Sequence, residues 1–317
     1  MSLPTVAQYR GEIVEALHPF SAVAVEGAQV VGRLGDEIQT TWRSASKPFQ
    51  LATSLEALGD PEVDTRTLAI GAASHSAEPV HVALVEALLS RFGLEAGLLR
   101  CGAHPPVHTP SAEQILRAGG HFTDLHNNCS GKHTFMLAAA AQNGWALDYR
   151  PLAHPLQQRN RARLEALCGG PSATATDGCG VPTFGFPLSG LARAWAALAG
   201  AMADPDVDPR LSRIGWAMAQ HPELTSGTGR LDLDVVRGAQ ESMAVKIGAM
   251  GVFCIALPRR RLGVAVKVAT GSGDVLPAAV QAALDAFAPG AFVPPADWEL
   301  LKIRNVVGQA VGRIAQG

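Results

Sequence analysis

Residues 251–270 read GVFCIALPRRRLGVAVKVAT, and this stretch decides the fold. Apolar residues alternate before and after the three arginines at 259–261, which is typical of two strands joined by a solvated turn. The stretch SAVAVEGAQVVGRLGD, at residues 21–36, alternates in the same way on both sides of Gly27. Hairpins near both ends of the chain predict one antiparallel sheet that the N- and C-terminal segments share.

The sequence between these hairpins predicts helices. Amphipathic segments that end at Gly or Pro occupy residues 77–93, 111–120, 132–144, 155–170, 188–200 and 208–222. A last alanine-rich helix, at 276–288, is expected to cover the sheet. We therefore predict an α+β fold over a single domain, residues 1–317. Its sheet comes from about 1–45 and 240–317, and its helical region covers about 46–239.

The composition excludes several classes of protein. With 317 residues, of which 47% are hydrophobic and 17% charged, the chain is expected to be globular. Its net charge of −2 and the lack of long charge runs predict no nucleic-acid or membrane partner. No secretory signal or membrane-spanning stretch is evident, so we expect a cytoplasmic protein. Five widely spaced cysteines predict reduced thiols, with Cys168 and Cys254 as small buried side chains.

The stretch RSASKPFQ, at residues 43–50, places Ser44 three positions before Lys47. A helix is predicted from about Ser44 to Gly59, and residues three apart lie on one helix face. Ser44 is then either a nucleophile beside its base or the polar start of a helix beside a solvated lysine. The tetrapeptide alone favours the second interpretation, although the helix dipole disfavours a cation in the first turn.

Two more segments carry candidate residues. In ASHSAEP, at residues 73–79, Ser76 is a candidate helix cap, and His75 is a candidate acid, base or core residue. In VKIGAMG, at residues 245–251, Lys246 enters a strand, and Lys267 is expected on the opposite strand. A lysine there can point into a cleft, although a lysine that reaches solvent at the sheet edge is the ordinary expectation.

Polar residues crowd around two cysteines in HNNCSGKHT, residues 126–134, and TDGCGVP, residues 176–182. Cys129 and Cys179 with nearby His and Asp residues could form a zinc site, but two buried loop cysteines are the simpler alternative, since no C-x-x-C spacing occurs. The Gly-rich loop TSGTGRLD, at 225–232, has neither the P-loop nor the dinucleotide spacing, so no phosphate cofactor is predicted.

Taken in order, these segments resemble a known family. The blocks are RSASKPFQ, SHSAEP, CGAHPP, HNNCSGKHTFML, TDGCGVP, GTGRLD and KIGAMGVFCIALP. Together they are similar to the asparaginase II family, the zinc-containing L-asparaginases of rhizobial type. The fold of that family is similar to that of serine β-lactamases and penicillin-binding proteins. The resemblance covers nearly the whole chain, and HNNCSGKH is its most specific block.

The resemblance implies two Ser-Lys pairs, Ser44 with Lys47 and Ser76 with Lys246. Ser44 would be the nucleophile and Lys47 its base, while Ser76 and Lys246 would relay protons or support the second step; the reverse assignment stays open. The residues implied for substrate contact are Arg43, His75, His133 and Asp177.

The family's metal site would fall on Cys129, Lys132 and Cys179, with Zn²⁺ as the cofactor and water as a fourth ligand. Lysine must lose a proton to bind a metal, so zinc occupancy should fall at acid pH. The resemblance also implies a homodimer. One departure is Met250, where the family often has an acidic residue.

The function implied is an amidohydrolase that cleaves L-asparagine to L-aspartate and ammonia through a serine acyl-enzyme. One alternative is a β-lactamase or peptidase-like serine acyl hydrolase, which the missing S-D-N motif disfavours. The other is a catalytically silent zinc-binding or metabolite-binding protein on the same fold.

Overall fold

The computed structural model describes residues 3–296 and 298–317. Its strands are β1 (Thr5–Arg10), β2 (Ile13–Glu26), β3 (Gln29–Leu34), β4 (Gln39–Thr41), β5 (Ala173–Thr176), β6 (Pro182–Pro187), β7 (Ala244–Gly248), β8 (Val252–Leu257), β9 (Leu262–Val268), β10 (Lys302–Arg304) and β11 (Ala310–Gln316). Its α-helices are α1 (Lys47–Ala57), α2 (Thr65–Gly71), α3 (Pro79–Arg91), α4 (Thr109–Arg117), α5 (Ser130–Gln142), α6 (Pro155–Cys168), α7 (Leu188–Ala203), α8 (Pro209–Gln220), α9 (Pro222–Thr225), α10 (Leu231–Arg237) and α11 (Leu276–Phe287). The 3₁₀ helices are η1 (Arg43–Ser46), η2 (Ala96–Leu98), η3 (Asp124–His126), η4 (Pro258–Arg260) and η5 (Glu299–Leu301).

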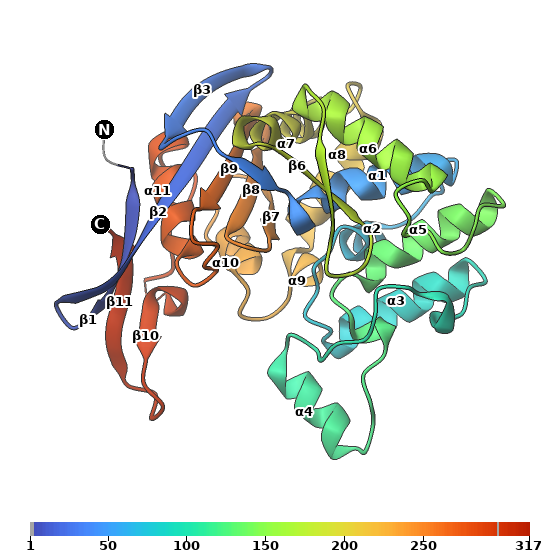
Figure 1. Ribbon diagram of the computed structural model, residues 1–317, viewed down its shortest axis with the longest axis horizontal. Helices are drawn as coiled ribbons and strands as arrows, with labels where there is room; N and C mark the ends of the chain where they lie inside the picture. The colour runs from blue at the N-terminus through green and yellow to red at the C-terminus, as the bar shows by residue number, and fades with distance from the viewer. Residues whose placement is uncertain (1–2, 297) are drawn as a thin grey trace.

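The two ends of the chain share one antiparallel sheet, as predicted. Within the described ranges it has eight strands in the order β10-β11-β1-β2-β9-β8-β7, with β3 also paired to β2. β1 lies against β11, with Val6 opposite Gln316, and the second half of β2 lies against β9 (Figure 1). The predicted α+β fold, with a sheet from both ends and a largely helical middle, is therefore confirmed.

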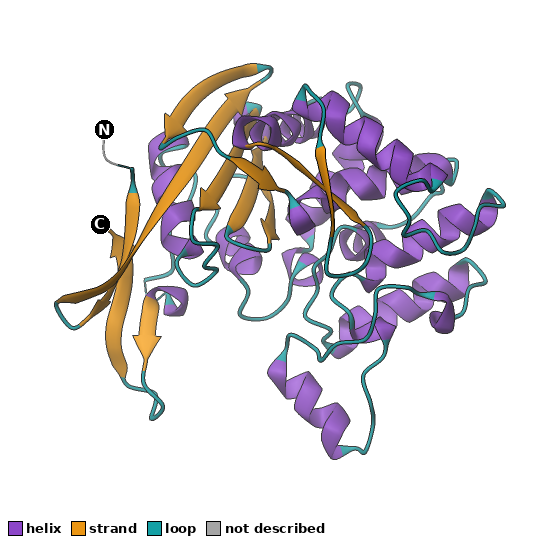
Figure 2. Ribbon diagram, viewed as in Figure 1, coloured by secondary structure: helices purple, strands orange, loops and turns teal. Residues whose placement is uncertain are grey.

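The hairpin at 251–270 explains how this sheet is packed. β8 and β9 are joined through η4 and Arg261, so the arginines do form the turn. Val264 and Val266 face a core with α11, whereas Ala265 between them faces the helical region. α7 covers that second face (Figures 1 and 2). Gly263 lets the α7 backbone approach β9, because a Cβ at Gly263 would lie 2.1 Å from the Ala196 nitrogen.

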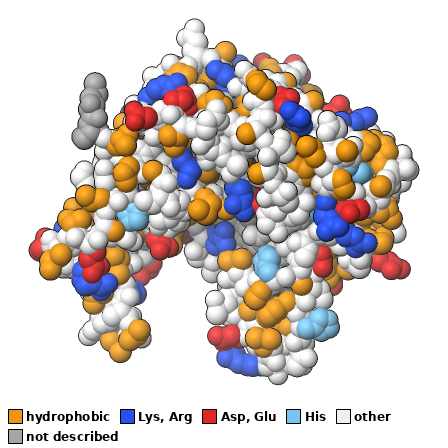
Figure 3. Space-filling model, in the orientation of Figure 1, with side chains coloured by type: hydrophobic (Ala, Val, Ile, Leu, Met, Phe, Trp, Pro, Cys, Tyr) orange, Lys and Arg blue, Asp and Glu red, His pale blue; other side chains and the backbone are white. Residues whose placement is uncertain are grey.

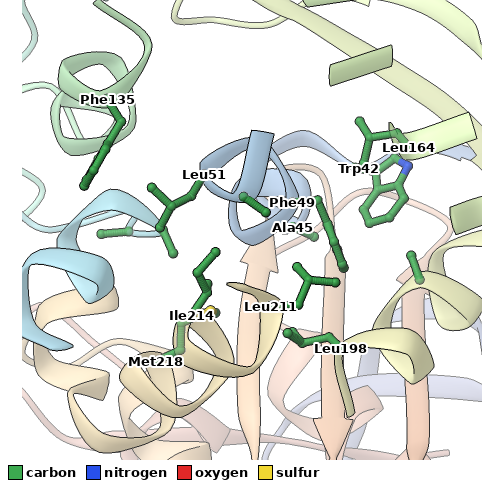
Figure 4. Close-up of a cluster of buried hydrophobic side chains, with 14 of the residues drawn as sticks. Trp42, Ala45, Phe49, Leu51, Phe135, Leu164, Leu198, Leu211, Ile214 and Met218 are labelled. Atoms are coloured by element: carbon green, nitrogen blue, oxygen red, sulfur yellow. The ribbon is translucent and has the colours of Figure 1, made fainter. Parts of the chain in front are cut away.

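The helical region packs around α1, which is buried along nearly its whole length. Figure 4 shows the apolar cluster around this helix. Phe49 and Leu51 of α1 lie among Phe135 from α5 and Leu211 and Ile214 from α8. The six helices predicted in this region are present as α3 to α8. Apolar burial of this kind is the dominant favourable contribution to folding.

The middle region also contains structure that the sequence did not reveal. β5 and β6 pair with each other, and β6 pairs with β4, which forms a small second sheet beside η1. α2, α9 and α10 are short helices without a long amphipathic period. No helix among the described residues is long and apolar enough to cross a membrane.

Candidate active site

Ser44 lies where the small sheet passes into α1. Trp42 fixes this junction, since its ring is fully buried and packs edge-on against Phe49 at 5.4 Å and Phe186 at 6.0 Å. Ser44 follows in η1 and is only partly buried. Its hydroxyl has no hydrogen-bond partner among the described side chains and backbone groups, so it is free to act on a bound molecule.

Lys47 begins α1 and is buried, with 1% of its surface exposed. Its Nζ lies 2.5 Å from the Ala73 carbonyl, 2.9 Å from Ser74 Oγ and 3.2 Å from the Asn128 carbonyl. The structure thus brings Ser74, rather than Ser44, into hydrogen-bond contact with this amine. Burial lowers the pKa of Lys47, and the charge of Lys132 lowers it further, against an opposing contribution from Cys129. Both effects favour a neutral amine that can accept a proton.

Ser76 lies in the buried loop between α2 and α3. Its hydroxyl donates to the Ser226 carbonyl at 3.1 Å. Gly227 comes so close that a Cβ at this position would lie 2.4 Å from Ser76 Oγ. The backbone of Ser76 accepts a hydrogen bond from His108, just before α4. The loop between α9 and α10 therefore forms one wall around this serine.

Lys246 projects from β7 and is fully buried, which differs from the solvent-reaching lysine expected at a sheet edge. Its Nζ bonds to Asp232 Oδ1 on α10 at 3.1 Å and to the Ile247 carbonyl at 3.4 Å; the structure shows no hydrogen bond to Ser76. Burial lowers its pKa to about 8, although Asp232 raises it. Lys267 does not face Lys246, because β8 lies between β7 and β9.

Arg43 and Asp177 form an ion pair, with Nε and Oδ1 2.7 Å apart. Arg43 has a φ of 50°, and this left-handed conformation of a non-glycine residue costs about 1–3 kcal/mol. Asp177 begins the turn between β5 and β6. Burial raises its pKa, but the charges of Lys132 and Arg43 outweigh burial and leave the pKa below its usual value. The pair presents both signs of charge at the partly open side of the site.

The two predicted histidines, His75 and His133, are fully buried and hydrogen-bond to neighbouring hydroxyl groups. His75 Nε2 lies 2.9 Å from Ser130 Oγ. His133 Nδ1 lies 2.9 Å from the Tyr149 hydroxyl, and His133 Nε2 has no partner in the described part of the chain. Burial lowers the pKa of both imidazoles well below the usual value, so both are neutral.

Cys129, Lys132 and Cys179 come together although they lie on two separate segments. Cys129 precedes α5, Lys132 lies in its first turn, and Cys179 comes from the β5–β6 turn. Lys132 Nζ lies 3.4 Å from Cys179 Sγ, and all three side chains are buried. The Cys179 hydrogen bond, with the charges of Lys47 and Lys132, lowers the pKa of Cys129 well below its usual value. These contacts favour the thiolate form of Cys129.

Two sulfur ligands and one amine fit a tetrahedral metal site with one open position. In the described ranges, no group of three or more His, Cys, Asp or Glu side chains is placed to hold a metal ion, and this cluster has two such residues beside Lys132. Burial lowers the pKa of Lys132, but Cys179, Cys129 and Asp177 raise it more. A bound cation would therefore have to displace the Lys132 proton.

Lysine is rare in this chain, and its distribution marks the site. The sequence has five lysines, of which Lys47, Lys132 and Lys246 are buried here. Two functional contacts escaped the sequence analysis, Ser74 on Lys47 and Asp232 on Lys246. Both residues lie in segments with candidate residues or unusual composition. Ser74 is part of ASHSAEP, and Asp232 is the last residue of TSGTGRLD.

The face of the molecule seen in Figure 3 is hollowed. Figure 3 shows a depression between the lobe that carries α4 and the arm of β1, β10 and β11, with Lys and Arg side chains around it. In the same orientation, the α9–α10 loop lies between the sheet and the helical region (Figure 1). A separate cavity of about 650 Å³, lined by residues such as Glu26, Ala197 and Arg261, shares no residue with the site.

The chain is similar to known proteins in sequence and in structure. The family model described as L-asparaginase II matches residues 6–316. No curated protein sequence matches the chain. Among solved structures, the chain is similar to Mglu in its native form in the presence of 4.3 M NaCl, with 16% identity and a TM-score of 0.45. That match covers 84% of this chain and 60% of Mglu, so the chain spans less than two thirds of its length.

The chain is also similar to a β-lactamase from Mycobacterium bovis. The identity is 14% and the TM-score 0.45, over 84% of this chain and 94% of that chain. At such TM-scores neither likeness carries an argument, and the fold assignment rests on the topology of the sheet itself.

Proposed function

The chain belongs to the L-asparaginase II family, and we propose that it hydrolyses the side-chain amide of L-asparagine to L-aspartate and ammonia. One observation carries this proposal. Two buried lysines, Lys47 and Lys246, lie close enough for the charge of one to lower the pKa of the other, next to loops that carry Ser44 and Ser76. Buried amines with lowered pKa values are suited to proton transfer at a serine.

In the first step, Ser44 Oγ attacks the amide carbonyl carbon and its proton passes to Lys47. The amide nitrogen then takes this proton from Lys47, the carbon–nitrogen bond breaks, and ammonia leaves. An ester between the aspartyl group and Ser44 remains. Ser44 suits this role because its hydroxyl is partly exposed and has no partner among the described residues. Lys47 suits the role of base because burial lowers its pKa.

In the second step, water attacks the ester carbonyl carbon. We assign Lys246 as the base that takes the proton of this water, with Ser76 as a relay. The bond between carbon and Ser44 oxygen breaks, and the proton returns to Ser44. One water is consumed for each amide cleaved, and both lysines regain their starting state. The pKa of Lys246, about 8, suits a base that works near neutral to mildly alkaline pH.

The Arg43–Asp177 pair suits an amino-acid substrate. The guanidinium can bind a carboxylate, and the aspartate can bind an ammonium group, so a zwitterion can bridge or replace the pair. Glutamine is one methylene longer, and a pocket distinguishes such a difference by only about 1–3 kcal/mol. Some cleavage of glutamine is therefore expected.

We also propose that Cys129, Lys132 and Cys179 hold Zn²⁺. When bound, zinc supplies a positive charge that attracts oxygen atoms of a ligand. The lowered pKa of Cys129 supports this assignment, because a thiolate is the form that binds metal. The homodimer and the cytoplasmic location remain proposals of the same kind, supported by the family resemblance.

Ammonia release from L-asparagine tests the function. We expect release by the wild type and a loss of about 100-fold or more in Ser44→Ala and Lys47→Ala, since a positioned acid–base group contributes about 10²–10⁴-fold. Ser76→Ala should retain the acylation step, and mass spectrometry should then detect an adduct on Ser44. Wild-type protein that releases no ammonia at millimolar asparagine would favour a binding protein. Full activity in all three variants would contradict the Ser-Lys mechanism.

The same protein preparation, tested with a β-lactam, distinguishes an asparaginase from a β-lactamase-like enzyme. A β-lactam that is hydrolysed faster than asparagine would favour a β-lactamase-like serine acyl hydrolase. An adduct on Ser76 instead of Ser44 would keep the amidohydrolase but reverse the two serines.

A further inference from the structure

Asp232 lies on α10 and reaches β7 with its carboxylate. Its Oδ1 accepts hydrogen bonds from Lys246 Nζ at 3.1 Å and from the backbone nitrogen of Ile247 at 2.9 Å. Both Asp232 and Lys246 are fully buried. The bond from Ile247 holds the carboxylate against β7. Two hydrogen bonds, one from the strand backbone and one from the amine, therefore fix the position of Oδ1 beside Lys246 Nζ.

The two contacts of Lys246 can both be kept when its amine loses a proton. A neutral amine has two N–H donors and one lone pair, and this amine has two acceptors, Asp232 Oδ1 and the Ile247 carbonyl. The third position around the nitrogen faces no hydrogen-bonding group among the described residues, so it can hold the lone pair. Three oxygen atoms surround Lys47 Nζ, and one of them, the Ser74 hydroxyl, can donate a hydrogen bond to the lone pair when this amine is neutral. Asp232 therefore determines where the lone pair of Lys246 points.

The second carboxylate oxygen of Asp232 indicates that burying the Asp232–Lys246 pair costs free energy of folding. Asp232 Oδ2 is buried and has no partner in the described part of the chain. A buried ion pair with an unsatisfied oxygen often stabilises a fold less than apolar side chains of the same volume would. Fold stability alone therefore does not account for an aspartate at this position.

We propose that Asp232 is a positioning residue of the active site, which holds the amine of Lys246 so that its lone pair is presented to the water of the second step. The proposal rests on the proposed function. Asp232 does not touch the substrate and acts only through Lys246.

The charges around Lys246 support this role. Burial lowers its pKa, Asp232 raises it, and the positive charges of Arg230 and of Lys47 in its protonated form lower it again. Cys254, opposite Lys246 on β8, is neutral because burial raises its pKa. Further charged residues near β7 have partners elsewhere: Arg43 with Asp177, Asp234 with Trp298, Arg210 with Asp60, and Arg213 with the Val63 carbonyl. Asp232 is thus the carboxylate that raises the pKa of Lys246 against burial and these charges.

The direct test measures Lys246 without using catalysis. Lysine labelled with ¹³C at Cε gives a simple spectrum in a chain with five lysines, and Lys246→Arg assigns the signal. We expect Asp232→Asn to lower the pKa of Lys246 by about 1–3 units, because a nearby opposite charge shifts a pKa by that amount. Asp234→Asn, on the same helix, should leave it unchanged. An unchanged Lys246 pKa in Asp232→Asn would overturn the proposal.

Kinetics give the second readout. Lys246 must be neutral to act as a base, so kcat rises as pH increases through its pKa. Removing the charge of Asp232 lowers that pKa, so the rising limb should move to lower pH. The kcat on the plateau should fall about tenfold or more, with KM less affected, since a positioned base contributes about 10²–10⁴-fold. Asp232→Glu should restore part of the loss, and Asp234→Asn should behave as the wild type.

The two proposals fail in different ways. A wild type that releases no ammonia defeats the asparaginase, while the NMR titration still decides the role of Asp232. If Asp232→Asn does not fold, folding of the double variant Asp232→Asn/Lys246→Met shows whether Asp232 acts through Lys246 or supports the fold directly. Recovery of folding shows that Asp232 acts through Lys246. If the double variant stays unfolded while Lys246→Met folds, Asp232 is a structural residue, and the proposal is overturned.

Discussion

Two lysines of one site are held in different ways, and this difference assigns their roles. Lys47 is surrounded by three oxygen atoms, including Ser74 Oγ, whereas Lys246 has two acceptors and a carboxylate partner. Burial lowers the pKa of both. Pairs of titratable groups in unlike environments commonly divide proton transfers between them. We therefore assign the first step to Lys47 and the second to Lys246.

The pH dependence of kcat follows from Lys246. Burial lowers its pKa to about 8, and the neutral amine forms above that pH. When the second step limits the rate, kcat should therefore rise as pH increases through about 8 and level off above it. A profile of ammonia release from about pH 6 to about pH 10 checks this, with protein stability measured at each pH. A kcat that falls across this range would contradict the assignment of Lys246 as a base.

Arg43 should govern substrate affinity. Its guanidinium pairs with Asp177 at the open side of the site, and hydrogen bonds to charged groups are worth about 1.5–3 kcal/mol. Arg43→Ala should therefore raise KM for asparagine about tenfold to a hundredfold, with a smaller effect on kcat. Arg117→Ala is the control, since Arg117 forms an exposed ion pair with Glu113 on α4. An unchanged KM in Arg43→Ala would exclude this contact.

At the scale of elements, the α9–α10 loop and α10 contact both members of the second serine–lysine pair, Ser76 and Lys246. The loop provides the Ser226 carbonyl and Gly227 to Ser76, and α10 then carries Asp232 to Lys246. One short element thus contacts Ser76 and supports Lys246. Its conformation should matter for catalysis more than its small contribution to the core would indicate.

Gly227→Ala tests this loop. Its φ is 136°, which L side chains rarely adopt, and the new Cβ would meet Ser76 Oγ at 2.4 Å. We expect a loss of about 1–3 kcal/mol in stability and at least about a tenfold loss of kcat. Gly229→Ala is the matched control, because its φ is also positive but a Cβ there meets nothing within 4 Å. Equal kcat in the two variants would show that contact with Ser76 has no role.

At the scale of the whole molecule, the proposed zinc ligands link α5 to the turn between β5 and β6. A metal that binds only the folded protein stabilises it, by about 2.7 kcal/mol at 100 times its dissociation constant. Added zinc should therefore raise the melting temperature of metal-free protein. Cys129→Ser should lose this response, and Cys168→Ser, another buried cysteine, should keep it.

Zinc content should also fall as pH falls. The Lys132 pKa is raised, so metal competes with a proton there, and acid favours the proton. Metal analysis after dialysis at several pH values measures this dependence. Equal zinc content in Cys129→Ser and the wild type, or none in either, would reject the site.

Much of the fold could be predicted because strands and helices leave local periodicities. The alternation at 251–270 and the helical periods at 132–144 and 188–200 both appear as predicted. β5 escaped prediction because ATAT is short and exposed, and β6 because PTFGFP is short and interrupted by proline and glycine. α10 is also too short for a long amphipathic period.

The sequence by itself determined the hairpins, the main helices, the family blocks and the candidate residues, since each depends on neighbours along the chain. Only the tertiary structure decided their partners. Lys47 meets Ser74, 27 positions away, and Arg43 meets Asp177, 134 positions away. The helix period that placed Ser44 and Lys47 on one face does not specify which oxygen atoms surround the amine. The packing of α1, β7 and α10 sets these contacts, and that packing depends on the whole buried core.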